Sequence, residues 1–219
     1  MPLELTIDPQ MANLKQRILE DTAKHLKDVL YAMKTSVKDR VGVLIEDAIN
    51  ESPEKRELED GILRAELGVE DGKGMVKKII EKLKENVDPL VIEPKLVGEG
   101  IEGGMLVQVL REDFQELLDL PDATYESYST RKHSPITVPW LEWLLTGGDG
   151  PIVQGYFYFT KIQPRYSRTE KGFMAKGSNR NWALSQYSGT GSDNWLTRAF
   201  KDLPEKIGNI LLEEFKKRF

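Results

Sequence analysis

Two glycine-rich segments are the parts of this chain whose spacing is closest to a nucleotide-binding motif. Gly98-Glu-Gly-Ile-Glu-Gly103 matches the pattern G-x-G-x-x-G, which in dinucleotide-binding proteins joins a strand to a helix beside a pyrophosphate. Here the glycines precede a predicted strand, and the two glutamates would repel phosphate. Gly68-Val-Glu-Asp-Gly-Lys-Gly74 is one residue short of a phosphate-binding loop and lacks the final Ser or Thr that would hold magnesium. We interpret both segments as turns.

The remaining side chains that could do chemistry form no recognisable catalytic set. His25 lies within a predicted helix and His133 in a polar segment, without the His-x-x-x-His spacing of a metal site. The sequence contains no Gly-x-Ser-x-Gly motif and no cysteine, which excludes thiolate catalysis. We therefore expect a protein that is not an enzyme and that needs neither a cofactor nor a metal ion.

Aromatic residues and glycines concentrate between Val138 and Phe200, a region that contains all four tryptophans. Such a region favours a contact surface, because glycine-rich loops can be ordered by a partner and aromatic side chains anchor interfaces. The alternative is that the tryptophans fill the core. The candidate interface residues are Trp140, Trp143, Arg165, Tyr166, Arg168, Lys171, Phe173, Lys176, Arg180 and Trp195.

Charge is distributed unevenly along the chain. Residues 161–180 carry six cations and one acid, a charge of +5, whereas the whole chain carries −5 and the remainder therefore −10. A basic segment on an acidic body can meet nucleic acid or an acidic neighbouring subunit, and it can also be a solvated loop.

Composition places the chain among proteins that fold around a hydrophobic core. Of its 219 residues, 39% are hydrophobic and 31% are charged, and no apolar run reaches the roughly 18 residues of a membrane-spanning helix. The first residues lack a basic region followed by an apolar run, so we expect no secretory signal. The absence of cysteine fits an intracellular or virion protein.

A single long helix is predicted at the start of the chain. Asp8 and Pro9 form a typical helix start, and apolar residues then recur every three or four positions, which predicts about 40 helical residues and about 60 Å. Gly42 is the predicted bend. We expect residues 1–50 to form an arm whose stripe packs on another chain or a second helix, and residues 51–219 to form a core domain. The stripe consists of Met11, Leu14, Ile18, Thr22, Leu26, Val29, Met33, Val37, Val41, Leu44 and Ala48.

The rest of the chain alternates between helical and strand periodicity, which predicts an α+β fold with mostly antiparallel strands and helices packed on them. In chain order the pattern first predicts a helix from Ser52-Pro53 to Gly68 and a third helix ended by Pro89. A hairpin of Leu90–Val97 and Met105–Leu110 follows, with the glycine-rich turn between its strands, and then a short helix over Phe114–Leu120 and a polar loop over Pro121–Thr137. The last predicted elements are a strand over Ile152–Ile162, a short pairing strand near Trp182, and a final helix capped by Asp193 and kinked at Pro204.

Three segments, in this order, carry a resemblance to a known family. Ser52-Pro53 is followed by Leu58-Glu-Asp-Gly-Ile-Leu-Arg-Ala-Glu-Leu-Gly68, then by strands, then by the basic stretch around Tyr166-Ser-Arg-Thr-Glu-Lys-Gly-Phe-Met174, and the chain closes on Asn194-Trp-Leu-Thr-Arg-Ala-Phe200. This arrangement resembles the neck and tail-completion proteins of tailed bacteriophages over most of the chain. The long first helix and the segment 112–137 depart from the short members of that family.

The resemblance implies a curved sheet with helices on one side, assembled as a homo-oligomeric ring at the head-to-tail junction. A virion location follows, as do neighbours among the connector or adaptor and the tail terminator or tail tube proteins, with DNA as a passenger in the lumen and no membrane contact. The alternative is a nucleic-acid-binding module, in which the cations of residues 161–180 bind phosphates and Tyr166 or Phe173 stacks on bases. The acidic remainder of the chain argues against that alternative.

Overall fold

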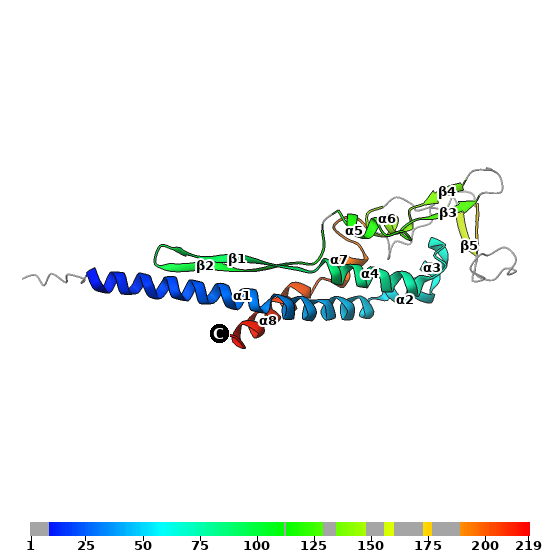
Figure 1. Ribbon diagram of the computed structural model, residues 1–219. Coiled ribbons are helices and arrows are strands. Elements are labelled where there is room, and N and C mark those ends of the chain that lie inside the picture. The colour runs from blue at the N-terminus through cyan, green and yellow to red at the C-terminus, as the bar shows by residue number, and fades with distance from the viewer. Residues whose placement is uncertain (1–8, 112, 129–134, 148–155, 160–172, 177–188) are drawn as a thin grey trace, which may run out of the picture.

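The computed structural model describes residues 9–111, 113–128, 135–147, 156–159, 173–176 and 189–219, and it shows an elongated molecule (Figure 1). One helix runs along most of its length, a long hairpin lies beside the first half of that helix, and the shorter elements gather at the other end. The helices are α1 (Pro9–Glu51), α2 (Pro53–Asp60), α3 (Ile62–Leu67), α4 (Gly72–Asn86), α5 (Gln115–Leu118), α6 (Trp140–Leu145), α7 (Trp195–Ala199) and α8 (Leu203–Lys216). The strands are β1 (Asp88–Val97), β2 (Gly100–Gln108), β3 (Tyr125–Tyr128), β4 (Pro135–Val138), β5 (Tyr156–Phe159) and β6 (Phe173–Lys176).

Helix α1 confirms the long helix predicted from the apolar stripe, but it runs through Gly42 without interruption. Gly42 lies beside the side chain of Lys84 on α4, and a Cβ there would make an ordinary van der Waals contact at 3.5 Å. The bend predicted from the sequence is absent, and packing does not require a glycine at this position.

Side-chain caps fix the helix boundaries after α1. Ser52 caps α2 by accepting a hydrogen bond from the amide of Lys55 at 3.3 Å, as predicted. The single helix predicted from Ser52 to Gly68 is instead two, because the chain leaves helical geometry at Gly61 and begins α3 directly afterwards. Gly68 then ends α3 with a φ of +72°, the left-handed conformation that favours glycine.

The final helix is also divided. Asn194, and not Asp193, caps α7, through a reciprocal pair of hydrogen bonds with Thr197. Helix α7 ends at Ala199, and α8 begins at Leu203 with Pro204 in its first turn. Pro204 thus starts a helix, where its missing N–H costs nothing, and does not kink one.

The hairpin of β1 and β2 confirms the prediction, with a tighter turn. Gly98 adopts a φ of +58° and, with Glu99, forms the turn, so that the other glycines of this segment belong to β2. The register shifts between Ile92 and Lys95. A Cβ on Gly103 would lie 2.6 Å from the Cα of Pro94, so that this irregularity requires glycine on the opposite strand.

Two further hairpins correct the sequence-based prediction. Part of the segment 121–137, expected to be a polar loop, forms the antiparallel pair β3–β4. Strand β5 lies inside the predicted strand, but its partner β6 lies inside the segment expected to be a basic loop. The partner predicted near Trp182 lies outside the described residues. Among the described residues the strands form three separate two-stranded antiparallel sheets, so the α+β class is confirmed whereas a single curved sheet is not observed.

The hydrophobic core is built around the second half of α1. Side chains of α2, α4, α6 and α7 pack with it into one cluster, and α8 contacts it from the other side. The boundary expected at residue 50 therefore falls at the end of a helix whose second half belongs to the core. None of the described helices has the length and apolar character needed to cross a membrane. The α1 residues with at most 1% exposure are Met33, Val37, Val41, Ile45 and Ile49.

Candidate interaction surfaces

Two of the tryptophans proposed as interface anchors lie in the core. Trp140 is 2% exposed and Trp195 is fully buried, so neither side chain is available to a partner. The Nε1 of Trp195 donates a hydrogen bond of 2.9 Å to the Oγ of Ser52, which links α7 to the junction between α1 and α2. The Nε1 of Trp140 donates to the backbone oxygen of Asp122 at 2.7 Å. The core-filling interpretation therefore holds for both residues.

The other interface candidates fall into two groups. Trp143, on α6, is half-buried, which leaves part of its side chain accessible. Phe173 and Lys176 are the first and last residues of β6, so their backbone is strand rather than loop. The candidates that lie outside the described residues are Arg165, Tyr166, Arg168, Lys171 and Arg180.

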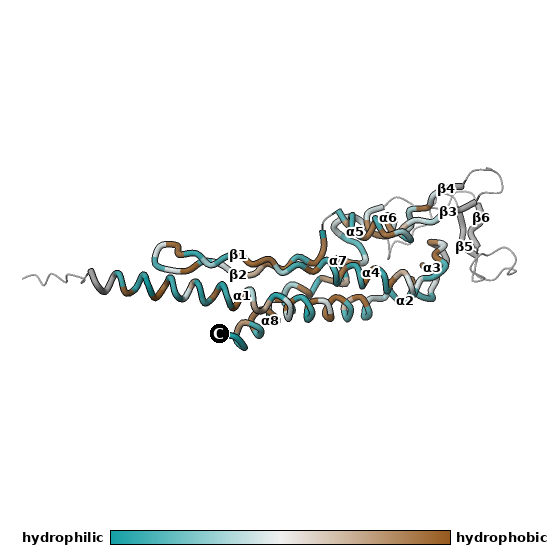
Figure 2. The backbone as a smooth tube through the Cα atoms, in the orientation of Figure 1, coloured by the Kyte–Doolittle hydropathy of each residue, from teal (hydrophilic) through white to brown (hydrophobic). Residues whose placement is uncertain are grey.

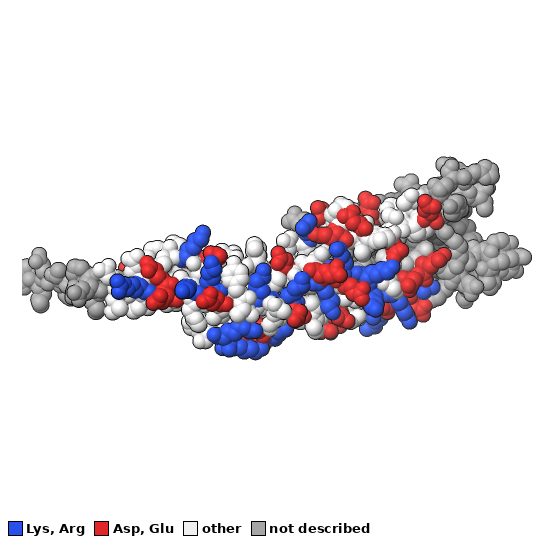
Figure 3. All heavy atoms as spheres, viewed as in Figure 1, with Lys and Arg blue, Asp and Glu red and all other residues white. Residues whose placement is uncertain are grey.

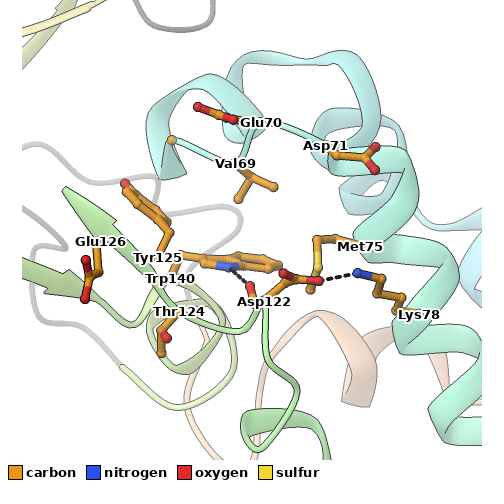
Figure 4. A pocket seen from close by; sticks show the side chains of 11 residues that line it. Val69, Glu70, Asp71, Met75, Lys78, Asp122, Thr124, Tyr125, Glu126 and Trp140 are labelled. Atoms are coloured by element: carbon orange, nitrogen blue, oxygen red, sulfur yellow. Dashed lines mark hydrogen bonds and ion pairs between the residues drawn. The ribbon is translucent and has the colours of Figure 1, made fainter.

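One pocket opens between the α3–α4 turn, β3 and the start of α6 (Figure 4). Its volume is about 430 Å³, and the indole of Trp140 forms one wall between Val69, Met75 and Tyr125. Most of its charged groups are carboxylates, and its cation, Lys78, is paired with Asp122. The hydrogen bond from Lys78 to Asp122 raises the pKa of the Lys78 ammonium.

The side chains that line this pocket include no histidine. Thr124 lines it, and the one lysine there, Lys78, is paired with Asp122. Within the part of the chain that the structure describes, no three Asp, Glu or His side chains are grouped closely enough to hold a metal ion. The pair of Lys78 and Asp122 joins α4 to the turn that precedes β3.

The projecting half of the molecule, which we call the arm, consists of α1 up to about residue 28 and the β1–β2 hairpin (Figure 1). Ion pairs fasten the hairpin to the helix at two levels. Lys27 pairs with Glu93 at 2.8 Å, and Lys15 pairs with Glu99 at 3.0 Å beside the hairpin turn. The Lys27 contact lowers the pKa of the Glu93 carboxyl, chiefly through its hydrogen bond. The arm is therefore a defined two-layer unit.

The inner face of the hairpin packs on α1. Pro89, Val91, Met105 and Val107 alternate along the two strands and are buried or half-buried, and the last three pack against the core cluster. Where the hairpin meets α1 and α8, an apolar groove of about 370 Å³ remains. Its lining residues are Leu26, Leu30, Met33, Pro94, Ile101, Gly103, Gly104, Met105, Leu211, Leu212 and Phe215.

The outer face of the hairpin is apolar as well, although it faces solvent. Leu90 and Leu106 are direct cross-strand partners, Ile92 pairs with Gly104 beside them, and the three larger side chains are 53–55% exposed. We call these four residues the hairpin face. An antiparallel sheet with one solvated side normally carries polar side chains there. In Figure 2 the hairpin is brown where these residues lie, near the body end of the two strands. Exposed apolar side chains that lie next to each other mark this face as a contact surface.

A second uncovered apolar surface lies on α1. Helix α8 covers one side of α1, where Ser36 and Arg40 bind its glutamates and the ring of His25 lies 5.7 Å from that of Phe219, the last residue. Leu14 and Ile18 stand eleven and seven residues before His25, so they continue the same side of the helix beyond the end of α8. Their exposures are 53% and 56%. We call this pair the helix stripe.

Helix α8 is held to α1 by a buried carboxylate. Glu214 is 2% exposed, and it accepts hydrogen bonds from Ser36 at 2.7 Å, from Arg40 at 3.0 Å and from Lys217 at 2.7 Å, with Arg218 in contact as well. These bonds, led by those from Lys217, Ser36 and Arg218, hold the pKa of the Glu214 carboxyl far below its usual range. This cluster holds the last turn of α8 against α1, on the side of the helix that the helix stripe continues.

Comparisons of the chain with protein-family models, with curated proteins and with solved structures found no match. The two surfaces of the arm are therefore the features on which a functional inference can rest. Sequence reasoning identified the helix stripe but not the hairpin face. Its signal was present in the sequence, because Leu90-Val-Ile92 and Met105-Leu-Val107 are apolar at consecutive positions and so predict a sheet that is apolar on both sides.

Proposed function

We propose that this chain is a non-enzymatic structural protein of a tailed bacteriophage, which assembles into a ring at the neck between the head connector and the tail. DNA passes through the lumen of that ring. The observation that supports the proposal is the arm, which carries apolar side chains on two separate uncovered surfaces. The location at the neck is proposed because the order of sequence segments resembles that of neck and tail-completion proteins.

The arm favours assembly over a solitary role. Contiguous apolar surface on a soluble protein marks a site of association, since leaving it in water costs about 25 cal/mol for each Å². The two surfaces differ in shape, because one is a pair of strands and the other is a ridge on a helix. Each surface therefore fits an unlike surface better than it fits the same surface on another copy. Head-to-tail contacts between unlike surfaces close into rings when the rotation per subunit permits.

The ends of the ring would meet the connector or adaptor on one side and the tail terminator or tail tube on the other. Charge supports contacts of this kind. The described body carries charged side chains of both signs over much of the face seen in Figure 3, and fewer lie over the hairpin. The basic segment 161–180 would then serve as a contact to an acidic neighbouring subunit.

Light scattering on the purified full chain, combined with negative-stain microscopy, tests the proposal. We expect a species several times the 25.0 kDa of one chain, visible as a ring, either for the protein alone or after addition of the connector protein of its phage. A strict monomer under all these conditions would overturn the proposal. A monomer that also forms a submicromolar complex with DNA at physiological salt would favour the nucleic-acid-binding module instead.

A further inference from the structure

We infer that the hairpin face of one copy packs on the helix stripe of the next copy, so that each β1–β2 hairpin is enclosed between two α1 helices. This inference rests on the proposed ring and specifies its subunit contact. Both surfaces belong to the arm, both are apolar, and both are more than half exposed in the single chain. The contact would cover both at once.

The chain already contains one example of this pairing. The inner face of the hairpin packs on its own α1, through Val91 and Met105 among others, and lies against Leu26 and Leu30 of that helix. A two-stranded sheet with apolar side chains on both faces can accept a second helix on its outer side in the same manner. The helix stripe is a stretch of that same helix without a cover of its own.

Gly104 is an independent indication that another backbone approaches the hairpin face. Glycine weakens the interior of a strand, and it commonly marks a bulge or a close approach. Gly104 has no positive φ, and a Cβ placed on it would meet no atom within 4 Å. Neighbouring Gly103, by contrast, is required by the bulge around Pro94. Beside Gly104 the hairpin face is therefore open, and a helix ridge seated beside Ile92 would fill this space.

Charge complementarity supports the helix stripe as the occupant. On the outer face, next to the apolar residues, Lys95 stands opposite Glu102 across the two strands. On α1, the exposed side chains of Arg17 and Asp21 are one helical turn apart and lie together along one side of Ile18. A hairpin laid on the helix stripe can therefore place Glu102 beside Arg17 and Lys95 beside Asp21, which selects one orientation.

Contact between two hairpin faces would cover less of the exposed apolar surface. It would cover Leu90, Ile92 and Leu106 of both copies, but it would leave Leu14 and Ile18 of both in water. It would also join copies in pairs related by a two-fold axis, and a pair does not extend into a ring. The pairing of hairpin face with helix stripe propagates from copy to copy.

Substitutions on the hairpin face test the inference in the full-length protein. Gly104→Val fills the open position, where a Cβ would meet no atom within 4 Å, and Ile92→Lys places a charge in the contact. We expect both variants to keep the wild-type melting temperature and to lose the large species in light scattering. Val43→Lys is the matched control, because Val43 is 54% exposed, compared with 55% for Ile92, and lies outside both surfaces. That variant should assemble like the wild type.

Disulfide trapping tests which surfaces meet. Because the chain has no cysteine, Ile18→Cys and Leu106→Cys can each be made as the sole thiol. Under mild oxidation we expect a covalent dimer when the two variants are mixed, and no more than a trace when either is oxidised alone. A dimer formed efficiently by Leu106→Cys alone would show contact between hairpin faces and would overturn the inference.

The outcomes separate this inference from the proposed ring. If the wild type assembles and both hairpin variants assemble equally well, the ring stands and the subunit contact proposed here is wrong. If the wild type remains monomeric alone and with its connector, the ring itself is wrong. Loss of assembly in Gly104→Val, with assembly retained in Val43→Lys and a mixed dimer formed on trapping, supports both.

Discussion

The two halves of α1 have the same apolar pattern but opposite surroundings. In the second half, Val37, Val41 and Ile45 are fully buried under α4 and α8, whereas in the first half Leu14 and Ile18 are more than half exposed. The stripe itself does not change between the two halves. The covering elements change, because α8 lies over the second half of α1 and reaches only as far as His25, which contacts Phe219. An apolar stripe thus shows which side of a helix is covered, but not whether the cover comes from the same chain.

Deletions should give the largest difference in effect between the two halves of α1. Removing residues 1–50 takes away five side chains that are at most 1% exposed, each worth about 2 kcal/mol, which is comparable with the whole net stability of about 5–15 kcal/mol. We expect that truncated protein to be unfolded or insoluble. Removing residues 1–20 should leave a folded monomer, because it removes the helix stripe and spares the core.

Circular dichroism and light scattering of the two truncated proteins measure these outcomes. A soluble, cooperatively folding chain without residues 1–50 would show that the second half of α1 is an accessory to the body, and the contrast between the halves would disappear. Assembly by a chain without residues 1–20 would show that the helix stripe is not a contact.

A matched pair of isoleucines sharpens the same contrast within one helix. Ile45 is fully buried and Ile18 is 56% exposed. Ile45→Ala should lower the free energy of unfolding by about 3 kcal/mol, because it removes buried methyl groups and leaves a cavity. Ile18→Ala should change it by less than about 0.5 kcal/mol. Urea titration of both variants as monomers checks this, and equal losses would place both residues in equivalent environments.

Breaking an ion pair in the body and breaking one in the arm should change stability by amounts that differ less than those of the isoleucine variants. Glu214→Gln removes a carboxylate that is 2% exposed and has several donors, so we expect a loss of several degrees in melting temperature. Glu99→Gln breaks the arm's pair with Lys15, in which Glu99 is 89% exposed. We expect no measurable change there, because exposed pairs contribute little. A larger loss for Glu99→Gln would reverse the ranking.

The effect of Glu214 should depend on pH in a defined direction. Its pKa is depressed from an ordinary value of 4.5 by hydrogen bonds from Lys217, Ser36 and Arg218. The carboxylate therefore stabilises the fold above pH 4.5, and this contribution is lost as the pH falls through its folded pKa. The difference in melting temperature between the wild type and Glu214→Gln should stay constant from about pH 6 to 8 and shrink on acidification. A difference that grows with acid would contradict the assignment.

Features with a local physical cause were predictable from the sequence. The cap at Ser52 and the stop at Gly68 follow from residues whose side chains or backbone freedom act on their immediate neighbours, whereas the predicted cap Asp8 lies outside the described residues. Helical periodicity gave the buried side of α1. The β1–β2 hairpin was predictable because two apolar runs flank a glycine-rich turn.

The remaining features depend on distant residues. Strands β3 and β4 have only four residues each, Tyr125-Glu-Ser-Tyr128 and Pro135-Ile-Thr-Val138, which is too short for a clear alternation of apolar and polar residues. Trp195 is buried because Ser52, 143 positions earlier, accepts its hydrogen bond. Gly42 resembles a hinge in sequence, but α1 runs through it because elements that are distant in sequence pack along both sides of this part of the helix. Of the interface candidates, Trp140 and Trp195 were placed in the core by contacts that residue type alone does not reveal.

The bond between Ser36 and Glu214 joins residues 178 positions apart, so α8 can cover its side of α1 only after residue 214 has been made. At a synthesis rate of about 5–20 residues per second, that delay is roughly 10–40 seconds. Throughout this interval the side of α1 around Ser36 and Arg40 stays open on the growing chain. Newly made chains are therefore at risk of associating through that side of α1, and completion of α8 closes it.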